Sequence, residues 1–160
     1  MLTVNSLTKV YGLSWARCGW VFAPPAVTRA IGHVLLTTAG SAPPSSAALG
    51  LAAFAAHEQL WQRSHQWATT NFQRVKQWLD AQPHLYWQAP PHGLFGFVWH
   101  RSGENLRSRI EQGCADRGVL VVPGQFFGAP TGFRLAWSCH ETLLETGLQQ
   151  LEAVMVGEPP

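Results

Sequence analysis

The stretch SLTKVYGLSWARCGW, residues 6–20, organises the interpretation of this chain. Residues 3–5 before it form a short extended run, and hydroxyl and glycine residues then interrupt regular structure around a single lysine, Lys9. Residues 18–23 return to an apolar run, which Pro24-Pro25 ends. The pattern therefore predicts that Lys9 lies in a loop between two buried strands.

Lys9 in such a loop has a chemical use. A lysine is a nucleophile only when it is neutral, and burial together with the nearby charge of Arg17 would lower its pKa toward that form. Ser6, Thr8 and Arg17 offer the hydroxyl and guanidinium donors that suit a phosphate monoester. Taken alone, a loop lysine is more often a solvated surface charge than a catalytic group.

The whole stretch resembles the lysine motif of the fold-type I (class I/II) aminotransferases, which depend on pyridoxal 5'-phosphate (PLP). The residues in register are Ser6, Lys9, Gly12, Arg17, Gly19 and Trp20, with Thr8 in place of a second serine. The resemblance implies that Lys9 is catalytic and forms the Schiff base with the cofactor. It also implies that Ser6, Thr8 and Arg17 contribute to cofactor binding through the phosphate. Trp15 departs from the family, which usually has glycine there, and a bulky indole would alter the loop or narrow the site.

A second informative pair of segments is VLVVPGQFFG, residues 119–128, and GFRLAWS, residues 132–138. An arginine between strand residues is, by itself, most often an exposed charge at a sheet edge. The two segments, however, look like the family's Pro-Gly strand and the following strand, whose arginine binds the substrate α-carboxylate. The resemblance thus implies substrate binding by Arg134. Nearby phenylalanines at 95, 97, 126 and 127 are expected mainly in the core, with some shaping the side-chain pocket.

Periodicity divides the rest of the chain into three parts. Residues 1–40 contain the lysine stretch and a helix over 26–38. Residues 41–81 form a turn and then one long helix, with small residues in its first half and an apolar core stripe in its second. Residues 82–160 form an α+β unit, with strands at 84–88, 94–100, 119–122 and 132–138, helices at 104–117 and 140–155, and a frayed end from 157. The fold class is α/β with an α+β C-terminal part. By resemblance it is a partial PLP-transferase fold of type I, in which these parts are the end of the large domain, an interdomain helix and the small domain.

Composition excludes several classes of protein. The 160 residues are 46% hydrophobic and only 12% charged, with eight Trp and eight Phe, which indicates a folded chain whose surface is partly covered. A net charge of +2 without basic clusters gives no sign of nucleic-acid binding. Three scattered cysteines favour neither disulfides nor zinc, and the pairs His57-Glu58 and His140-Glu141 lack a second histidine, so we expect no metal. No signal peptide or membrane span is recognisable, and the expected location is the cytoplasm.

The resemblance also sets an expectation about completeness. In the family, the aromatic residue stacked on the cofactor, the Asn near its ring oxygen and the Asp at its ring nitrogen all precede the lysine. The chain therefore looks like the C-terminal portion of a homodimeric PLP-dependent aminotransferase of amino acid metabolism or biosynthesis, acting on an α-amino acid and a 2-oxo acid. Two alternatives stay open: a truncated, inactive remnant or domain that needs a complementing chain, and a PLP-dependent lyase or decarboxylase. We expect poor solubility for residues 1–40 and a better-folded unit beyond residue 82.

Overall fold

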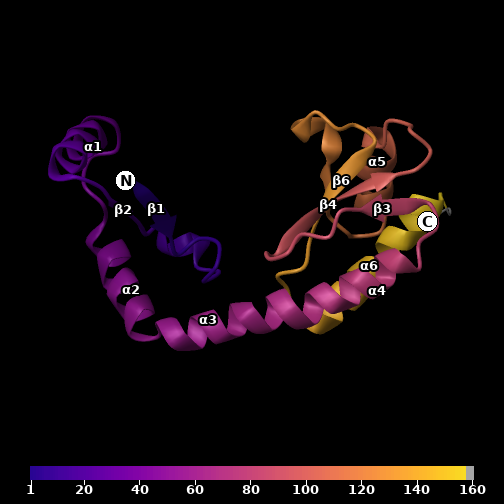
Figure 1. Cartoon of the computed structure of the whole chain (residues 1–160), viewed down its shortest axis with the longest axis horizontal. Coiled ribbons are helices and arrows are strands. Elements are labelled where there is room, and N and C mark those ends of the chain that lie inside the picture. The colour runs from indigo at the N-terminus through magenta and orange to yellow at the C-terminus, as the bar shows by residue number, and fades with distance from the viewer. Residues whose placement is uncertain (158–160) are drawn as a thin grey trace. The chain divides into compact units, whose positions relative to one another are not determined.

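The computed structural model describes residues 1–157, so the last three residues of the expected frayed end lie outside the described part (Figure 1). The chain divides into two compact units, Met1–Ser64 and a second unit that begins at His65. This division falls inside the segment 41–81. Each unit is described by itself. The elements of the first unit are β1 (Thr3–Ser6), the 3-10 turn η1 (Ser14–Ala16), β2 (Gly19–Phe22), α1 (Pro25–Thr38), α2 (Pro44–Ala55) and most of α3 (His57–Gln66).

The first unit is built on a two-stranded antiparallel hairpin. β1 pairs with β2 in a register that places Ser6 opposite Gly19. The expectation of two buried strands was wrong, because every residue of β1 and β2 is exposed or half-buried. A two-stranded ribbon has no third strand beside it, so its faces depend on whatever packs against them. Leu7 and Ala16, in the loop between the strands, are each only 1% exposed.

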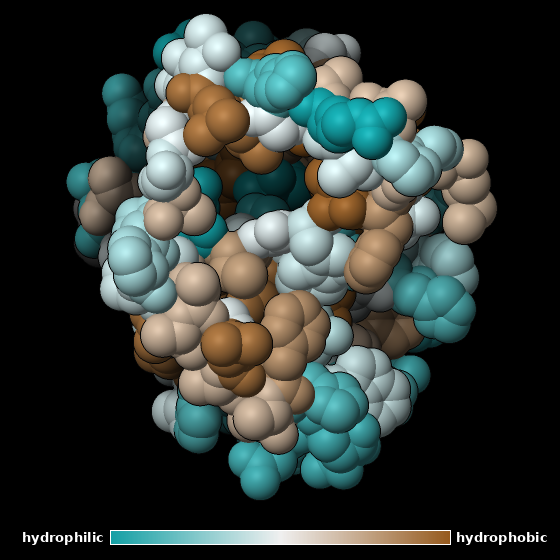
Figure 2. Space-filling view, turned by 90° about the vertical axis from the view of Figure 1, so that its left-hand side faces the viewer, coloured by the Kyte–Doolittle hydropathy of each residue, from teal (hydrophilic) through white to brown (hydrophobic). Residues whose placement is uncertain are grey.

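Helices α1 and α2 begin as the sequence predicts, each with proline in its first turn. α1 has no buried residue, although Val34, Leu35 and Leu36 are apolar and more than half exposed. Figure 2 looks at the side of Figure 1 where α1 and α2 lie, and it shows apolar side chains exposed among hydrophilic ones. The small residues of α2 allow one close approach: a Cβ on Gly50 would lie 2.9 Å from the sulfur of Cys18.

The single long helix expected within residues 41–81 is interrupted. α2 ends at Ala55, and Ala56 has φ −103° and ψ 16°, outside helical geometry, so α3 starts a new segment. A π-helical turn, η2 (Trp67–Asn71), then joins α3 to α4 (Phe72–Asp80). Wide turns of this kind shift the helix face by part of a turn. Here the turn ends at Asn71, whose side-chain amide donates to the carbonyls of Trp137 (2.8 Å) and Cys139 (2.9 Å).

The second unit is an α+β structure, as predicted. Its four-stranded antiparallel sheet has the order β3-β4-β6-β5. The bounds are β3 (Leu85–Trp87), β4 (Phe95–His100), α5 (Arg107–Asp116), β5 (Val122–Pro123), the 3-10 turn η3 (Gly124–Phe127), β6 (Gly132–Ala136) and α6 (Glu141–Val156). α5 is therefore shorter than the predicted 104–117, and β5 is shorter than the predicted 119–122.

One face of this sheet forms the core with α4, α5 and α6 (Figure 1). Val98, Phe133 and Trp137 are fully buried on it. The helices add Val75 and Leu79 from α4, Ile110 and Cys114 from α5, and Leu144, Leu148, Leu151, Val154 and Met155 from α6. The apolar core stripe predicted for the second half of the long helix, residues 60–79, is thus confirmed at Val75 and Leu79, whereas Trp61 is 47% exposed. α4 and α6 are also joined at the surface by Arg74, which bridges to Glu141 and, at 2.5 Å, to Glu145.

The opposite face of the sheet differs from the expectation. Phe95, Phe126 and Phe127 are 58%, 67% and 49% exposed and Phe97 is half-buried, so none of these four phenylalanines belongs to the core. In β4 and β6 the side chains alternate between faces, and Gly96, Val98, Phe133 and Leu135 take the core side. Leu120, expected in a buried strand, is 89% exposed because the segment before β5 lies at the sheet edge.

Candidate active site

The lysine loop is held closed by its own backbone. The Leu7 amide donates to the Cys18 carbonyl (3.0 Å) and the Leu13 amide donates to the Leu7 carbonyl (2.9 Å). A tight turn follows Lys9, because the Gly12 amide donates to the Lys9 carbonyl (3.1 Å) and Gly12 has φ +66°, a conformation that favours glycine. Lys9 itself is exposed. The burial assumed from the sequence is therefore wrong for this chain, since strands β1 and β2 do not enclose the loop.

The tip of the loop is anchored by α3. Arg63 donates from its guanidinium to the Tyr11 carbonyl (2.7 Å), and the hydroxyl of Ser64 donates to the Val10 carbonyl. A Cβ on Gly12 would lie 3.2 Å from the Arg63 guanidinium, so the glycine also permits this contact. These carbonyls belong to Val10 and Tyr11, the two residues that follow Lys9 in the chain. The helix thus fixes the backbone on which Lys9 is presented.

The phosphate-binding candidates gather at one end of the hairpin. Ser6 pairs with Gly19, and Thr8 and Arg17 lie two residues beyond these partners on their respective arms. The Thr8 amide donates to the Ser6 hydroxyl oxygen (3.3 Å), which leaves the Ser6 hydroxyl proton available for a ligand. Arg17 has φ 48° and ψ 39°, the left-handed conformation that non-glycine residues rarely adopt. Its exposed guanidinium makes a long hydrogen bond of 3.4 Å to the Ser14 carbonyl.

Trp15, the departure from the family pattern, lies in η1 and is 63% exposed. Its neighbour Ala16 is the residue of this turn that is buried, at 1% exposure. The small alanine is thus enclosed, whereas the indole is exposed. The bulky residue is therefore accommodated without entering the interior of the loop.

Removing the Ser64 hydroxyl is expected to loosen the lysine loop. Ser64→Ala leaves the Val10 carbonyl without its partner at a position that is 6% exposed, which costs about 1 kcal/mol of local stability. We expect faster amide hydrogen exchange at residues 7–13, measured by mass spectrometry, with little change in the second unit. Ser46→Ala, at a half-buried serine in α2, is the control; equal exchange in both variants would contradict the anchoring role.

Arg134 belongs to the second unit, in β6 between Phe97 of β4 and Val122 of β5. Its guanidinium carbon lies 5.6 Å from the ring centre of Phe95 and 5.5 Å from that of Phe127. Within residues 1–157, no carboxylate or carbonyl accepts a hydrogen bond from Arg134. The half-buried guanidinium can thus bind an external anion without first breaking an ion pair.

Other titratable groups do not extend either cluster. Burial, followed by the charge of Arg109 and then by His84, lowers the pKa of His100, and its imidazole Nδ1 contacts the Ser102 hydroxyl at 2.7 Å. Burial also raises the pKa of the Cys114 and Cys139 thiols, which favours the unreactive neutral form. Among the residues that the structure describes, no group of three metal-ligating side chains occurs. Nor does any helix in the described range have both the length and the apolar character needed to cross a bilayer.

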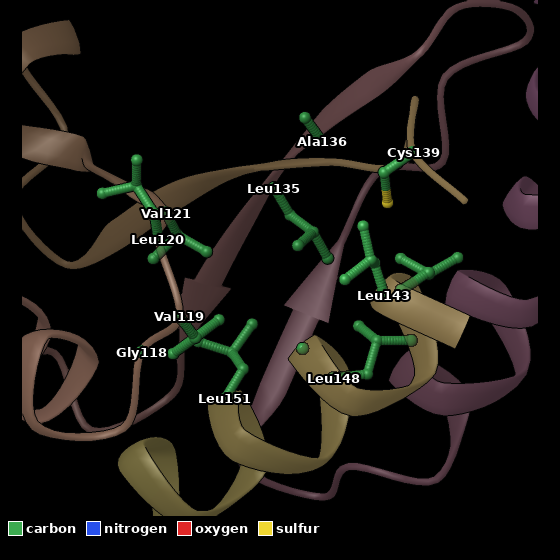
Figure 3. A pocket seen from close by; sticks show the side chains of 12 residues that line it. Gly118, Val119, Leu120, Val121, Leu135, Ala136, Cys139, Leu143, Leu148 and Leu151 are labelled. Carbon is green, nitrogen blue, oxygen red and sulfur yellow. The ribbon is translucent and has the colours of Figure 1, made fainter. Parts of the chain in front are cut away.

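The hollow drawn in Figure 3 is separate from these clusters. It has a volume of about 200 Å³ and lies among the segment before β5, strand β6 and helix α6. Figure 3 shows Val119, Leu135, Leu143 and Leu148 converging on it, with Cys139 at its rim. The lining is apolar and offers no charged side chain. This hollow has no group suited to binding a phosphate or a carboxylate.

Two features of the site were not predicted from the sequence. Arg63 and Ser64 bind carbonyls that lie 52 and 54 residues away, and no local pattern indicates contacts at such separation. Phe95 and Phe127 flank Arg134, although phenylalanine in an apolar segment is usually buried. The alternation of side chains along β4 could have indicated the exposed face. Phe95 and Phe97 point to one face of the strand, and Gly96 and Val98 point to the other.

Comparisons with known proteins identify the family of this chain. The model of the family "Aminotransferase class I and II" matches residues 1–151. Capreomycidine synthase of Streptomyces vinaceus is 28% identical over 149 residues, covering 92% of this chain and 38% of that protein. Aspartate aminotransferase of Rhizobium meliloti is 30% identical over 169 aligned positions, covering 95% of this chain and 40% of that protein.

Solved structures give the same result. The crystal structure of a PLP-dependent aminotransferase from Streptococcus suis 89-1591 matches with a TM-score of 0.91 and 26% identity, covering 99% of this chain and 42% of that one. The chain therefore spans about two fifths of the length of these relatives. The predicted partial PLP-transferase fold of type I is confirmed, and this chain belongs to the class I and II aminotransferase family.

Proposed function

We propose that this chain forms the lysine-bearing and carboxylate-binding part of a PLP-dependent aminotransferase that acts on an α-amino acid and a 2-oxo acid. The observation that carries the proposal is the loop after β1. It presents Lys9 on a backbone fixed by α3, with Ser6, Thr8 and Arg17 at the same end of the hairpin. Because the chain spans two fifths of its relatives' length, the activity is assigned to the whole enzyme of which it is a part.

The donor set suits the phosphate of PLP. A phosphate dianion accepts several hydrogen bonds, and two hydroxyls and one guanidinium can supply charge-assisted ones. Arg17 has no ion pair within residues 1–157, and its left-handed backbone holds it in a conformation that costs of order 1 kcal/mol to maintain. Such local strain is typical of residues placed for binding rather than for stability.

Lys9 has the role of attaching and assisting the cofactor. PLP, when bound, acts as an electron sink for bonds at the substrate Cα. Lys9 holds it through Nζ, and the same nitrogen moves the proton at the substrate Cα. No hydrogen bond or ion pair engages Nζ among the described residues, whereas the other lysine, Lys76, binds Asp80 at 2.6 Å.

Arg134 completes the proposal as the group that binds the substrate carboxylate. Its planar guanidinium can make two parallel hydrogen bonds to a carboxylate, each worth about 1.5 to 3 kcal/mol. The absence of a competing acid in residues 1–157 supports this role. Cytoplasmic location and homodimeric assembly are part of the proposal. The three unpaired cysteines are typical of a reducing compartment, and the exposed apolar side chains of residues 1–64 are typical of surfaces that associate.

Those exposed side chains also favour a second candidate, a domain that is active only with a complementing chain. Trp15, Phe22, Leu51, Phe54 and Trp61 are between 47% and 73% exposed in the first unit. Apolar surface on this scale favours contact with more protein. The test is to assay aminotransferase activity of this chain alone and after mixing with a separate chain that carries the other three fifths of a related aminotransferase. Activity that appears only on mixing supports the second candidate.

Cofactor attachment can be tested on the chain itself. PLP is added, the product is reduced with borohydride, and the modified lysine is located by peptide mapping. We expect saturable labelling of Lys9 and weak labelling of Lys76, which serves as the internal control. Arg17→Gln should raise the PLP concentration for half-saturation about tenfold, because a charge-assisted bond is lost. Labelling that is spread over Lys76 and the N-terminus, and is the same in Lys9→Ala, would show that the chain has no cofactor site.

A further inference from the structure

The free face of the second unit's sheet carries a continuous row of aromatic side chains that ends at Arg134. The strand register places Tyr86 beside Trp99, and Phe97 beside Arg134, all on the face opposite the core. Tyr86 stacks on Trp99 at 5.6 Å, Trp99 contacts Phe97 at 4.8 Å, and Phe97 meets the edge of Phe127 at 5.8 Å, all between ring centres.

The positions of the rings in this row depend on close backbone contacts at two glycines. A Cβ on Gly132 would lie 2.5 Å from a ring carbon of Phe97 and 2.5 Å from the Val98 carbonyl, so Phe97 lies directly against a glycine. Phe127 is carried by η3, whose first residue, Gly124, is also enclosed by backbone atoms. The rings are therefore positioned by two sites that accept only glycine, and their exposure is a property of the fold.

On the sheet face opposite the core, the Arg134 side chain is flanked by apolar rings. Phe95 and Phe127 flank its guanidinium at 5.6 and 5.5 Å, while the remaining cation of the row, Arg101, lies over Tyr86 at the other end. A carboxylate bound to Arg134 therefore has ring carbons of Phe95 and Phe127 beside it. Among residues 65–157, no hydrogen bond or ion pair to the Arg134 guanidinium is found, and the contacts that it makes are with these two rings.

We propose that Phe95 and Phe127 make this a site for carboxylates that bear an apolar, preferably aromatic, side chain; the inference rests on the proposed function of Arg134. A substituent close to the carboxylate removes apolar surface of both rings from water, and aromatic groups gain further from offset or edge contacts. A small or doubly charged acid gains neither contribution. The substrate class is thus an amino acid or 2-oxo acid with a large apolar side chain.

The test uses the whole chain and three probes: phenylpyruvate, pyruvate and 2-oxoglutarate, titrated by saturation-transfer NMR. We expect phenylpyruvate to bind about tenfold more tightly than the other two. Phe127→Ala should remove this preference, whereas Phe126→Ala should keep it, because Phe126 is even more exposed (67% against 49%) but its ring is not one of the two that flank Arg134. Leu120→Ser tests whether the aromatic acid binds instead in the hollow beside α6, which Leu120 lines. This change should leave the affinity for all three acids unaltered.

The outcomes distinguish the two proposals. Arg134→Gln should weaken all three acids. Equal affinity for the three, lost in Arg134→Gln, would overturn the apolar substrate class and leave the carboxylate site standing. Binding that is unaffected by Arg134→Gln, or no binding of any acid, would overturn the role of Arg134 together with the inference drawn from it.

Discussion

Gly124→Ala is expected to destabilise the second unit by more than about 3 kcal/mol, a large share of the stability of a domain of this size. A Cβ at this position would lie 2.1 Å from the Ala129 carbonyl oxygen and 2.4 Å from the Gly132 carbonyl oxygen. Both obstacles are backbone atoms, so no side-chain rotation can relieve the clash. The loop from Gly124 to Gly132 would have to open.

Urea unfolding followed by tryptophan fluorescence measures this effect. Gly147→Ala in α6 is the matched control, because its Cβ would meet only the Val119 side chain at 3.9 Å. In a helix this change should stabilise the chain by up to about 1 kcal/mol. A Gly124→Ala variant that unfolds at the same urea concentration as the original chain would show that the loop is not held as described. A destabilised variant should also lose phenylpyruvate binding, since η3 carries Phe127.

Asn71→Asp is expected to destabilise the second unit by at least about 3 kcal/mol at pH 7. The Asn71 amide donates to two carbonyl oxygens, those of Trp137 and Cys139, and the residue is only 3% exposed. An aspartate there replaces the donor with an acceptor and brings a buried negative charge toward both oxygens. Asn105→Asp is the control, because the exposed Asn105 accepts from the Arg107 amide, a role that a carboxylate fills equally well.

The loss should depend on pH with a definite sign. Burial and the two carbonyls would raise the folded-state pKa of the new carboxyl above its unfolded value. The variant should therefore be most stable below the unfolded pKa of about 4 and should lose stability as the pH rises through the folded pKa. Urea midpoints measured from pH 4 to pH 8 check this trend against Asn105→Asp. A variant that is no less stable at pH 8 than at pH 4 would exclude a buried charge as the cause.

Much of the second unit could be predicted from local pattern. Helix α6 repeats apolar residues at Leu144, Leu148 and Leu151 with helical spacing, and the period of two in β4 and β6 indicates strands. These signals are strong because each element has one face on a common core. The interruption at Ala56 and the π turn before Asn71 could not be predicted in this way, since helix-forming residues continue through both. The π turn ends at Asn71, whose amide donates to the carbonyls of Trp137 and Cys139, residues far away in the chain.

In the candidate site, too, some features could be predicted from the sequence and others could not. The residue types and their spacing around Lys9 and Arg134 resemble the motifs of the family, and the match to the family over residues 1–151 confirmed that identification. Burial was predicted poorly in both places: the strands around Lys9 and the phenylalanines around Arg134 were expected inside and are exposed. An apolar residue in a strand gives the same signal whether its face meets a core or solvent.

The sequence by itself thus indicated most helices and strands of the second unit, the family, and the residues proposed to carry the chemistry, because these depend on local period and on chemical type. The tertiary structure alone decided that α3 anchors the lysine loop through Arg63 and Ser64 and that Phe95 and Phe127 flank Arg134 on the free face of the sheet. Such contacts join segments far apart in the chain. They follow from the register of strands and the direction of side chains, which only the folded backbone fixes.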